Sequence, residues 1–191
     1  YTQRKQGIDG GKTATLAPEE LDDEYFMMRV RIDGGQLSRE QLRVLASIST
    51  DFARSTADIT DRNNIQYHWI AIEDVPEIWR RLEAVGLDTL EACGDCTRTT
   101  LGSPVASVHP DEVIDATPAI EFIKANYVGD PDLANLPRKF KSSIAWLPDA
   151  APEINDISFV GVLHPDNGPG FDLQIGGGPV SYTHLTLPTK G

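Results

Sequence analysis

Between residues 24 and 92 the spacing of apolar positions alternates between the period of a strand and that of a helix. Short runs rich in aromatic and branched residues predict strands, whereas apolar residues recurring every three or four positions predict amphipathic helices. The predicted elements are a strand over 24–32, a helix over 39–55, a strand pair over 59–72, a helix over 74–86 and a strand over 87–92. This order is typical of a split β-α-β, ferredoxin-like domain of the α+β class.

From residue 93 onward the apolar pattern is less regular, because Gly, Ser and Pro interrupt it more often. The predicted elements there are a helix starting at 117, a strand over 138–147, and strands over 157–163 and 171–175. Alternation along the first of these strands places Lys139 and Lys141 on one face. We interpret residues 93–178 as the start of a second α/β domain.

The two ends of the sequence differ from the rest in composition. Residues 1–22 are rich in polar residues and glycine, which predicts an N-terminal arm ahead of the ferredoxin-like domain over 23–92. Residues 179–191 match the translation of a transposase-type sequencing adapter, so we interpret them as an artefactual tail and exclude His184 from any site. Because the chain starts at Tyr1, we expect the natural sequence to extend upstream, and to continue past Gly178.

Composition and charge narrow the range of functions. The chain has 191 residues and a formal net charge of −12, which disfavours nucleic acid and anionic membranes as partners. No apolar run approaches the roughly 18 residues of a membrane span, and the first residues lack the features of a secretory signal. Two cysteines cannot form a disulfide framework, so a reducing, cytoplasmic location is expected.

The two cysteines form a Cys-x-x-Cys motif, Cys93 to Cys96, followed closely by Arg98. Such a motif can be half of a zinc site, a redox pair or a coincidence. Two thiolates cannot complete a tetrahedral metal site, and the spacing of the histidines does not supply the missing ligands, so no metal site is predicted within the chain. A redox pair stays open, although the following arginine suits anion binding equally well.

Four basic residues stand out in this acidic chain: Arg29, Arg98, Lys139 and Lys141. They come from three separate segments and could converge on a small dianion, since arginine and lysine both neutralise oxyanions. The alternative is that all four are solvated surface charges. Arg29 in particular could lie on the solvent face of an edge strand.

Polar residues of the predicted strand pair are also ambiguous. Gln66 and His68 share one strand face, where the imidazole could touch the edge of a cofactor. A histidine packed within the sheet is the commoner arrangement.

Five segments in the same order resemble the N-terminal half of sirohaem-containing sulfite and nitrite reductases, and most closely the actinobacterial ferredoxin-dependent sulfite reductases. These segments are 25–31, 61–69, 92–98, 136–141 and the glycine-rich stretch 168–178. The resemblance implies that the second domain binds sirohaem. It also implies that electrons pass from ferredoxin through a 4Fe–4S cluster to the sirohaem, where sulfite is reduced to sulfide.

The resemblance also assigns roles to individual residues. Those matching the basic substrate cage of the family are Arg29, Arg98, Lys139 and Lys141; those matching the sirohaem-lining segment are Arg62, Gln66 and His68; and those matching a covalently joined tyrosine and cysteine are Tyr1 and Cys93. The four cysteine ligands of the cluster lie in the family's C-terminal half and are absent from this sequence. We therefore expect this fragment to be inactive by itself.

The resemblance predicts a monomeric, cytoplasmic oxidoreductase of sulfur assimilation, with sulfite as substrate. Ferredoxin–nitrite reductase is the close alternative, because it shares the scaffold. A non-catalytic ferredoxin-like module that docks a redox partner or holds an anion is the alternative from a different class.

Overall fold

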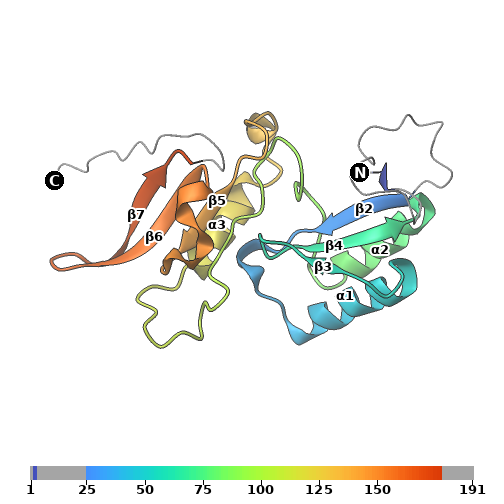
Figure 1. Cartoon of the computed structure of the whole chain (residues 1–191), viewed down its shortest axis with the longest axis horizontal. Helices are drawn as coiled ribbons and strands as arrows, with labels where there is room; N and C mark the ends of the chain where they lie inside the picture. The colour runs from blue at the N-terminus through green and yellow to red at the C-terminus, as the bar shows by residue number, and fades with distance from the viewer. Residues whose placement is uncertain (1, 4–24, 178–191) are drawn as a thin grey trace. The chain divides into compact units, whose positions relative to one another are not determined.

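The computed structural model describes residues 2–3 and 25–177, and these fall into two compact units (Figure 1). The first unit comprises Tyr1–Arg31, Leu37–Thr60 and Ile65–Thr89, and the second comprises Ile32–Gln36, Asp61–Asn64 and Leu90–Gly191. The second unit therefore takes two short segments from within the sequence of the first. The predicted arm, apart from residues 2–3, and the predicted tail lie outside the described residues.

The first unit contains a four-stranded antiparallel sheet in the order β1-β2-β4-β3. The elements of this unit are β1 (Thr2–Gln3), β2 (Tyr25–Val30), α1 (Arg39–Phe52), β3 (Asp58–Ile59), β4 (Ile65–Ile70) and α2 (Val75–Glu83). The two helices contact each other, and α1 also contacts β4 (Figure 1). The order of strands and helices confirms the prediction of a ferredoxin-like unit.

Sequence features explain where the helices of the first unit begin and end. Ser38 and Gln41 form a capping box at the start of α1, in which each side chain accepts a hydrogen bond from the other residue's backbone N–H. The helix ends at Phe52, earlier than predicted, because Arg54 and Ser55 adopt positive φ angles of 53° and 58°. Both predicted helices are confirmed, with shorter C-terminal ends.

The core of the first unit is apolar. The side chains buried there include Val30, Leu45, Ile48, Tyr67, Ile70, Ile78 and Leu82. Tyr67 is the one that carries a polar group, and its hydroxyl donates a 2.8 Å hydrogen bond to the backbone oxygen of Leu45. The apolar residues that the helical and strand periods of the sequence place on one face are therefore the ones buried in this core.

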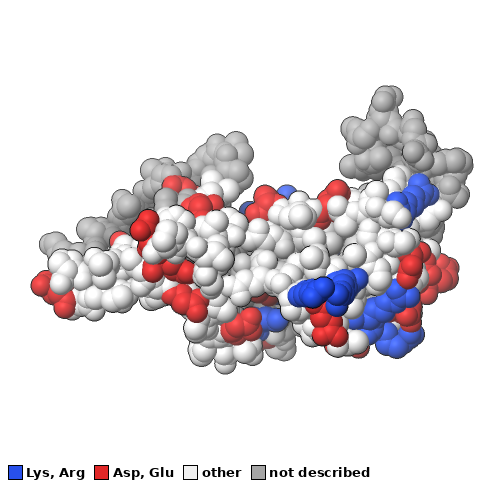
Figure 2. Space-filling model, turned by 90° about the horizontal axis from the view of Figure 1, so that it is seen from below, with Lys and Arg blue, Asp and Glu red and all other residues white. Residues whose placement is uncertain are grey.

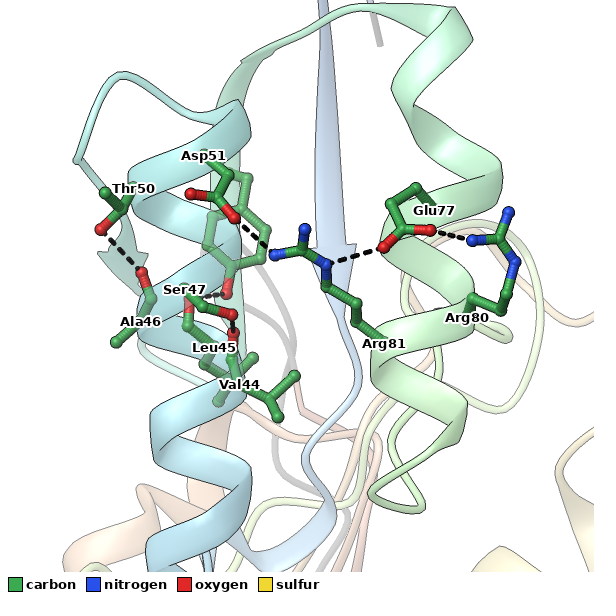
Figure 3. Close-up of polar contacts among 10 residues, drawn as sticks. Val44, Leu45, Ala46, Ser47, Thr50, Asp51, Glu77, Arg80 and Arg81 are labelled. Atoms are coloured by element: carbon green, nitrogen blue, oxygen red, sulfur yellow. Dashed lines mark hydrogen bonds and ion pairs between the residues drawn. The ribbon is translucent and has the colours of Figure 1, made fainter.

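Ion pairs connect the outer surfaces of α1 and α2. Arg81 of α2 donates to Asp51 of α1 over 2.6 Å and to Glu77 of its own helix over 3.0 Å (Figure 3). Arg80 also pairs with Glu77. Exposed pairs of this kind add little stability, so the helices are held chiefly by their apolar faces.

The prediction of a strand over 87–92 is wrong. One bridge joins this stretch to the sheet, where Arg31 donates its backbone N–H to the oxygen of Asp88 over 2.9 Å. The chain then turns at once, and Glu91 has a positive φ of 49°. A strand needs several consecutive pairings, which this turn prevents.

The second unit contains a mixed three-stranded sheet. The elements of this unit are α3 (Thr117–Tyr127), β5 (Ser142–Ala145), β6 (Ile157–His164) and β7 (Gly168–Ile175). β5 pairs with β6 in parallel, and β6 pairs with β7 as an antiparallel hairpin. On one face of the sheet, side chains of all three strands pack against α3; the residues of this cluster are Ala116, Ala119, Ile120, Ile123, Ile144, Phe159 and Phe171. The predicted helix at 117 and the strands over 157–163 and 171–175 are confirmed.

The predicted strand over 138–147 is mostly wrong, because β5 covers Ser142–Ala145 alone. Lys139 lies in a turn with a positive φ of 62°, so Lys139 and Lys141 do not share a strand face. Alternating polarity is a weak signal over so few residues, and Pro137 favours the turn that precedes the strand.

Taken together, the described elements give the mixed α and β class that the sequence predicts. None of the helices within residues 25–177 is long and apolar enough to cross a membrane.

Candidate functional site

The buried guanidinium group of Arg62 connects three distant segments of the second unit. Arg62 lies in the loop Asp61–Asn64, and it is 8% exposed. Its Nη1 donates to Asn155 Oδ1 over 2.7 Å, and its Nη2 donates to the backbone oxygens of Thr99 and Ser142 over 2.7 and 2.6 Å. These three acceptors lie 93, 37 and 80 residues from Arg62 in the sequence, so one side chain fixes their relative positions.

Asn64, from the same loop, makes a second connection to the segment 97–101. Its Nδ2 donates to Thr99 Oγ1 over 2.9 Å, while its Oδ1 accepts the backbone N–H of Ile32 over 2.9 Å. The segment 97–101 then reaches β5, because Leu101 donates to the oxygen of Ser142 and accepts from Ile144. Arg62 and Asn64 thereby hold an extended segment that has no helix or strand of its own.

Arg98 belongs to this segment, one residue before Thr99, and is 7% exposed. The pKa of the Arg62 guanidinium is lowered from its ordinary value to about 10, chiefly by burial and next by the nearby positive charge of Arg98; the carboxylates of Asp61, Asp156 and Asp33 act in the opposite direction. The structure therefore brings Arg62 and Arg98 within electrostatic reach of each other. Two guanidinium groups are thus buried in the same region of an otherwise acidic chain, with the carboxylates of Asp61, Asp156 and Asp33 near Arg62.

Lys139 and Lys141 precede β5 in the same unit. The side chain of Lys139 is exposed, whereas Lys141 is half-buried. The backbone of Lys141 is fixed by Asp156, whose carboxylate accepts its N–H over 2.8 Å and whose own N–H donates to the Lys141 oxygen over 3.0 Å. Lys141 thus enters the sheet next to Ser142, one of the acceptors of Arg62.

The first unit contributes three of the predicted site residues, all on β2 and β4. Arg29 and Gln66 are cross-strand neighbours, and the arginine donates two hydrogen bonds to Gln66 Oε1, from Nε over 3.1 Å and from Nη2. β2 pairs with β4 along most of its length, whereas β1 pairs only with Tyr25 and Phe26, so among the described strands Arg29 is flanked by β4 alone and the alternative of an edge position stays a prediction.

His68 is paired through one of its ring nitrogens. His68 Nε2 lies 2.9 Å from Asp58 Oδ2 on the neighbouring strand β3. Its Nδ1 is buried and has no hydrogen-bond partner among the described residues. One imidazole nitrogen is therefore paired across the sheet, and the other is enclosed without a partner among the described residues.

The two cysteines are separate thiols with different environments. Cys96 is 8% exposed, and its Sγ lies 3.7 and 3.6 Å from the backbone oxygens of Glu91 and Cys93. Cys93 is half-buried and forms no disulfide with Cys96. Tyr1, the predicted cross-link partner of Cys93, lies outside the described residues. In the part of the chain that the structure describes, no three His, Cys, Asp or Glu side chains are grouped so as to hold a metal ion.

Sequence reasoning missed two residues that organise this region, Thr99 and Asn155. Both are almost fully buried, at 1% and 2% exposure. Polar residues beside turns are usually exposed, so nothing in the local sequence marks them as buried. Their importance follows from partners that are distant in sequence.

Acidic side chains are spread over the surface in view, whereas basic ones gather over α1 and α2 (Figure 2). Arg80 and Arg81 of α2 are both paired with carboxylates. The buried arginines of the second unit, Arg62 and Arg98, are thus less exposed than Arg80 and Arg81 on α2.

Two family models match successive parts of the chain. The nitrite/sulfite reductase ferredoxin-like half domain matches residues 19–85, and the nitrite and sulphite reductase 4Fe-4S domain matches residues 93–186. Together they cover most of the sequence, in the order that the resemblance of the five segments predicts.

Individual relatives agree with these models. A sulfite reductase (ferredoxin) of Mycobacterium tuberculosis is 61% identical over 178 residues, which is 93% of this chain and 32% of the relative. A ferredoxin–nitrite reductase of Leptolyngbya laminosa is 41% identical over 159 residues, 80% of this chain and 31% of the relative. The solved structure of the Mycobacterium tuberculosis NirA protein superposes with a TM-score of 0.88 at 58% identity, covering 96% of this chain and 34% of that one.

The chain thus spans about a third of the length of the curated relatives it matches. It belongs to the nitrite and sulfite reductase family, whose ferredoxin-like half domain and 4Fe-4S domain it matches in succession.

Proposed function

We propose that this chain is part of a ferredoxin-dependent sulfite reductase, an oxidoreductase that reduces sulfite to sulfide with electrons from ferredoxin. The observation that carries the proposal is the 61% identity, over 93% of this chain, to a protein of that name. The identity to a ferredoxin–nitrite reductase is lower, at 41% over 80% of the chain. We therefore favour sulfite over nitrite as the substrate.

Four cations are proposed to act on the substrate: Arg29, Arg98, Lys139 and Lys141. Their role is to neutralise the oxyanion and to donate protons or hydrogen bonds to its oxygens as water leaves. The burial of Arg98 beside a second guanidinium supports this role, since an anion bound there would relieve the repulsion between the two.

The proposed lining of the sirohaem consists of Arg62, Gln66 and His68. Cationic and amide donors suit the carboxylates of such a macrocycle. The buried Nδ1 of His68, which has no hydrogen-bond partner among the described residues, fits a donor or acceptor on a bound cofactor. When bound, sirohaem supplies the iron chemistry of the reduction. A covalent bond between Tyr1 and Cys93 is a further proposal.

The residues of this chain do not fit a complete 4Fe–4S site. Such a cluster takes four cysteine thiolates, and the sequence has two cysteines. These two lie within one turn and, in the described part of the chain, are not grouped with other metal ligands. The cluster ligands are therefore assigned to the portion of the enzyme that this chain does not span, and the fragment is expected to be inactive alone.

We also propose that the whole enzyme is a cytoplasmic monomer. The two cysteines of this chain, too few for a disulfide framework, suit a reducing compartment. Gel filtration coupled to light scattering of the full-length protein measures the oligomeric state.

Growth complementation tests the proposed function. The complete reading frame that contains this chain should restore growth of a sulfite-reductase-deficient host on sulfate, but should not restore a nitrite-reductase-deficient host on nitrite. The reverse result would assign the enzyme to nitrite. Failure of both, with a purified protein that lacks a haem-like absorbance band, would favour a non-catalytic binding module.

A further inference from the structure

The segment 97–101 has no helix or strand of its own, and its first four residues are buried. Thr97, Arg98, Thr99 and Thr100 are 8%, 7%, 1% and 1% exposed. Buried backbone of this kind needs hydrogen-bond partners from elsewhere, because an unpaired buried group costs about 1–3 kcal/mol. The position of Arg98 is therefore set by whatever holds this segment.

Both short segments that the second unit takes from the sequence of the first supply those partners. From Asp61–Asn64, Arg62 donates to the backbone oxygen of Thr99 and Asn64 donates to its hydroxyl. From Ile32–Gln36, Asp33 Oδ1 accepts the N–H of Thr100 over 2.8 Å and Gly34 donates its N–H to the oxygen of Thr100 over 3.0 Å. The two residues that follow Arg98 are thus held by side chains or backbone from two other loops.

Arginine is the side chain that this arrangement requires. The acceptors of Arg62 come from three segments, and a planar guanidinium can donate to all of them at fixed angles. A lysine ammonium at the same position would be a point donor and could not span the same set. The lowered pKa of Arg62 also indicates that burying this cation near Arg98 is costly, so its bonds must offset that cost.

We propose that Arg62 is a positioning residue, which acts with Asn64 to hold the 97–101 segment and thereby aims the guanidinium of Arg98. This role is independent of any contact that Arg62 makes with a cofactor. The inference rests on the proposed function for the role of Arg98 toward sulfite.

The test uses the complete reading frame and two variants, Arg62→Lys and Thr99→Val, with Arg43→Lys as a matched control on the exposed face of α1. Arg62→Lys keeps the positive charge but loses the planar set of guanidinium donors. We expect this variant to raise KM for sulfite by about tenfold or more, with a smaller change in kcat. Its sirohaem absorbance should be retained. Thr99→Val is nearly isosteric and removes only the acceptor of Asn64, so a rise of about threefold is expected. Arg43→Lys should leave both constants unchanged.

Two results would overturn the inference. One is an unchanged KM in Arg62→Lys with normal sirohaem absorbance. The other is loss of the sirohaem band in Arg62→Lys with normal kinetics in Thr99→Val, which would leave Arg62 with its proposed cofactor role and no positioning role. If Arg62→Lys does not fold, Thr99→Val decides the matter by the same KM measurement.

Amide hydrogen exchange separates this inference from the proposed function. If the unmodified enzyme does not reduce sulfite, the proposed function fails, but the positioning role can still be measured. In Arg62→Lys the amides of Thr100 and Leu101 should then exchange about tenfold faster, while that of Tyr67 in the first unit stays unchanged. Equal exchange at Thr100 and Leu101 would refute the positioning role.

Discussion

The two compact units bury different kinds of side chain. In the first unit the described buried residues are apolar, apart from Arg31 and the hydroxyl of Tyr67. In the second unit four of the buried apolar residues are alanines, and many of the buried residues are polar; these are Arg62, Asn64, Thr97, Arg98, Thr99, Thr100, Ser103, Ser143, Asn155 and Ser158. The first core is held by apolar packing, whereas the second combines the apolar cluster at α3 with a network of buried hydrogen bonds.

This difference has consequences for what each unit can do. Apolar contacts are non-directional, so a core of this kind tolerates substitutions that preserve volume. A network of buried hydrogen bonds is directional and fixes each member relative to the others, but it fails when one partner is lost. The unit with the polar core is also the one that contains Arg98, Lys139 and Lys141. A substrate-binding arrangement benefits from such fixed positions more than a docking or structural unit does.

The largest effect is expected from cavity formation in the apolar core. Leu82 of α2 is fully buried, so Leu82→Ala should lower the free energy of unfolding by about 3 kcal/mol. The matched control is Leu42→Ala, at a position on α1 that is 57% exposed, where the loss should be below about 1 kcal/mol. Urea unfolding of both variants measures this difference. Equal losses would mean that the first unit is not held by its apolar core.

A somewhat smaller effect is expected from breaking the polar core at Asn155. Its Oδ1 accepts from Arg62, and its Nδ2 donates to the oxygens of Ala150 and Ala151 over 3.2 and 3.0 Å. Asn155→Ala should cost about 2 kcal/mol, because it leaves buried donors and acceptors unpaired.

The control for Asn155→Ala is Asn126→Ala, on the exposed surface of α3, where the loss should be close to zero. Hydrogen exchange resolves the location of the loss, which should fall on β5 and β6 and spare β4. A loss confined to β4 would contradict the division into an apolar and a polar core.

The apolar unit could be predicted closely from the sequence, because its core follows the periods of helix and strand. Leu45 and Ile48 fall on the buried face of α1, as their helical spacing predicts. The exception is the strand over 87–92, where the sequence has strand-like residues but the chain turns at Glu91. The local hydrophobic pattern indicates which secondary structure a segment prefers, but it does not indicate whether a neighbouring strand is placed to pair with that segment.

The polar unit was much harder to predict for the same reason. The stretch Asp61–Asn64 has the composition of a solvent-exposed turn, yet Arg62 and Asn64 are 8% and 2% exposed. Their burial depends on Thr99, Ser142 and Asn155, which no local pattern connects to the loop. The family resemblance singled out Arg62, but not the network that it organises. The roles assigned to Arg29, Gln66, His68 and the two lysines stay predictions.

The buried hydroxyl of Tyr67 in the first unit should make the free energy of unfolding depend on pH. Burial raises the pKa of Tyr67 above its ordinary value of 10.0, so the folded chain keeps a proton that the unfolded chain loses in alkaline solution. The free energy of unfolding therefore falls as pH rises above 10, by about 1.4 kcal/mol at pH 11. Tyr67→Phe lacks this dependence.

Near pH 8 the same substitution should cost about 1 kcal/mol, because the oxygen of Leu45 loses its donor. The stability curves of Tyr67→Phe and the unmodified chain should thus converge near pH 11 in urea titrations. Curves that stay parallel from pH 8 to 11 would mean that the hydroxyl reaches solvent and that the first core is wetter than its burial indicates.

The smallest expected effect is the coupling energy between two buried serines of the second unit. Ser143 on β5 donates to Ser158 on β6 over 2.8 Å, and Ser158 donates to the oxygen of Pro152 over 2.8 Å. Ser143→Ala and Ser158→Ala should each cost about 1 kcal/mol, whereas the double variant should cost about 0.5 kcal/mol less than their sum, since each single change leaves a partner unpaired. A double-mutant cycle in urea measures this coupling. A sum that is strictly additive would show that these serines contribute independently, and would contradict a coupled hydrogen-bond network between β5 and β6.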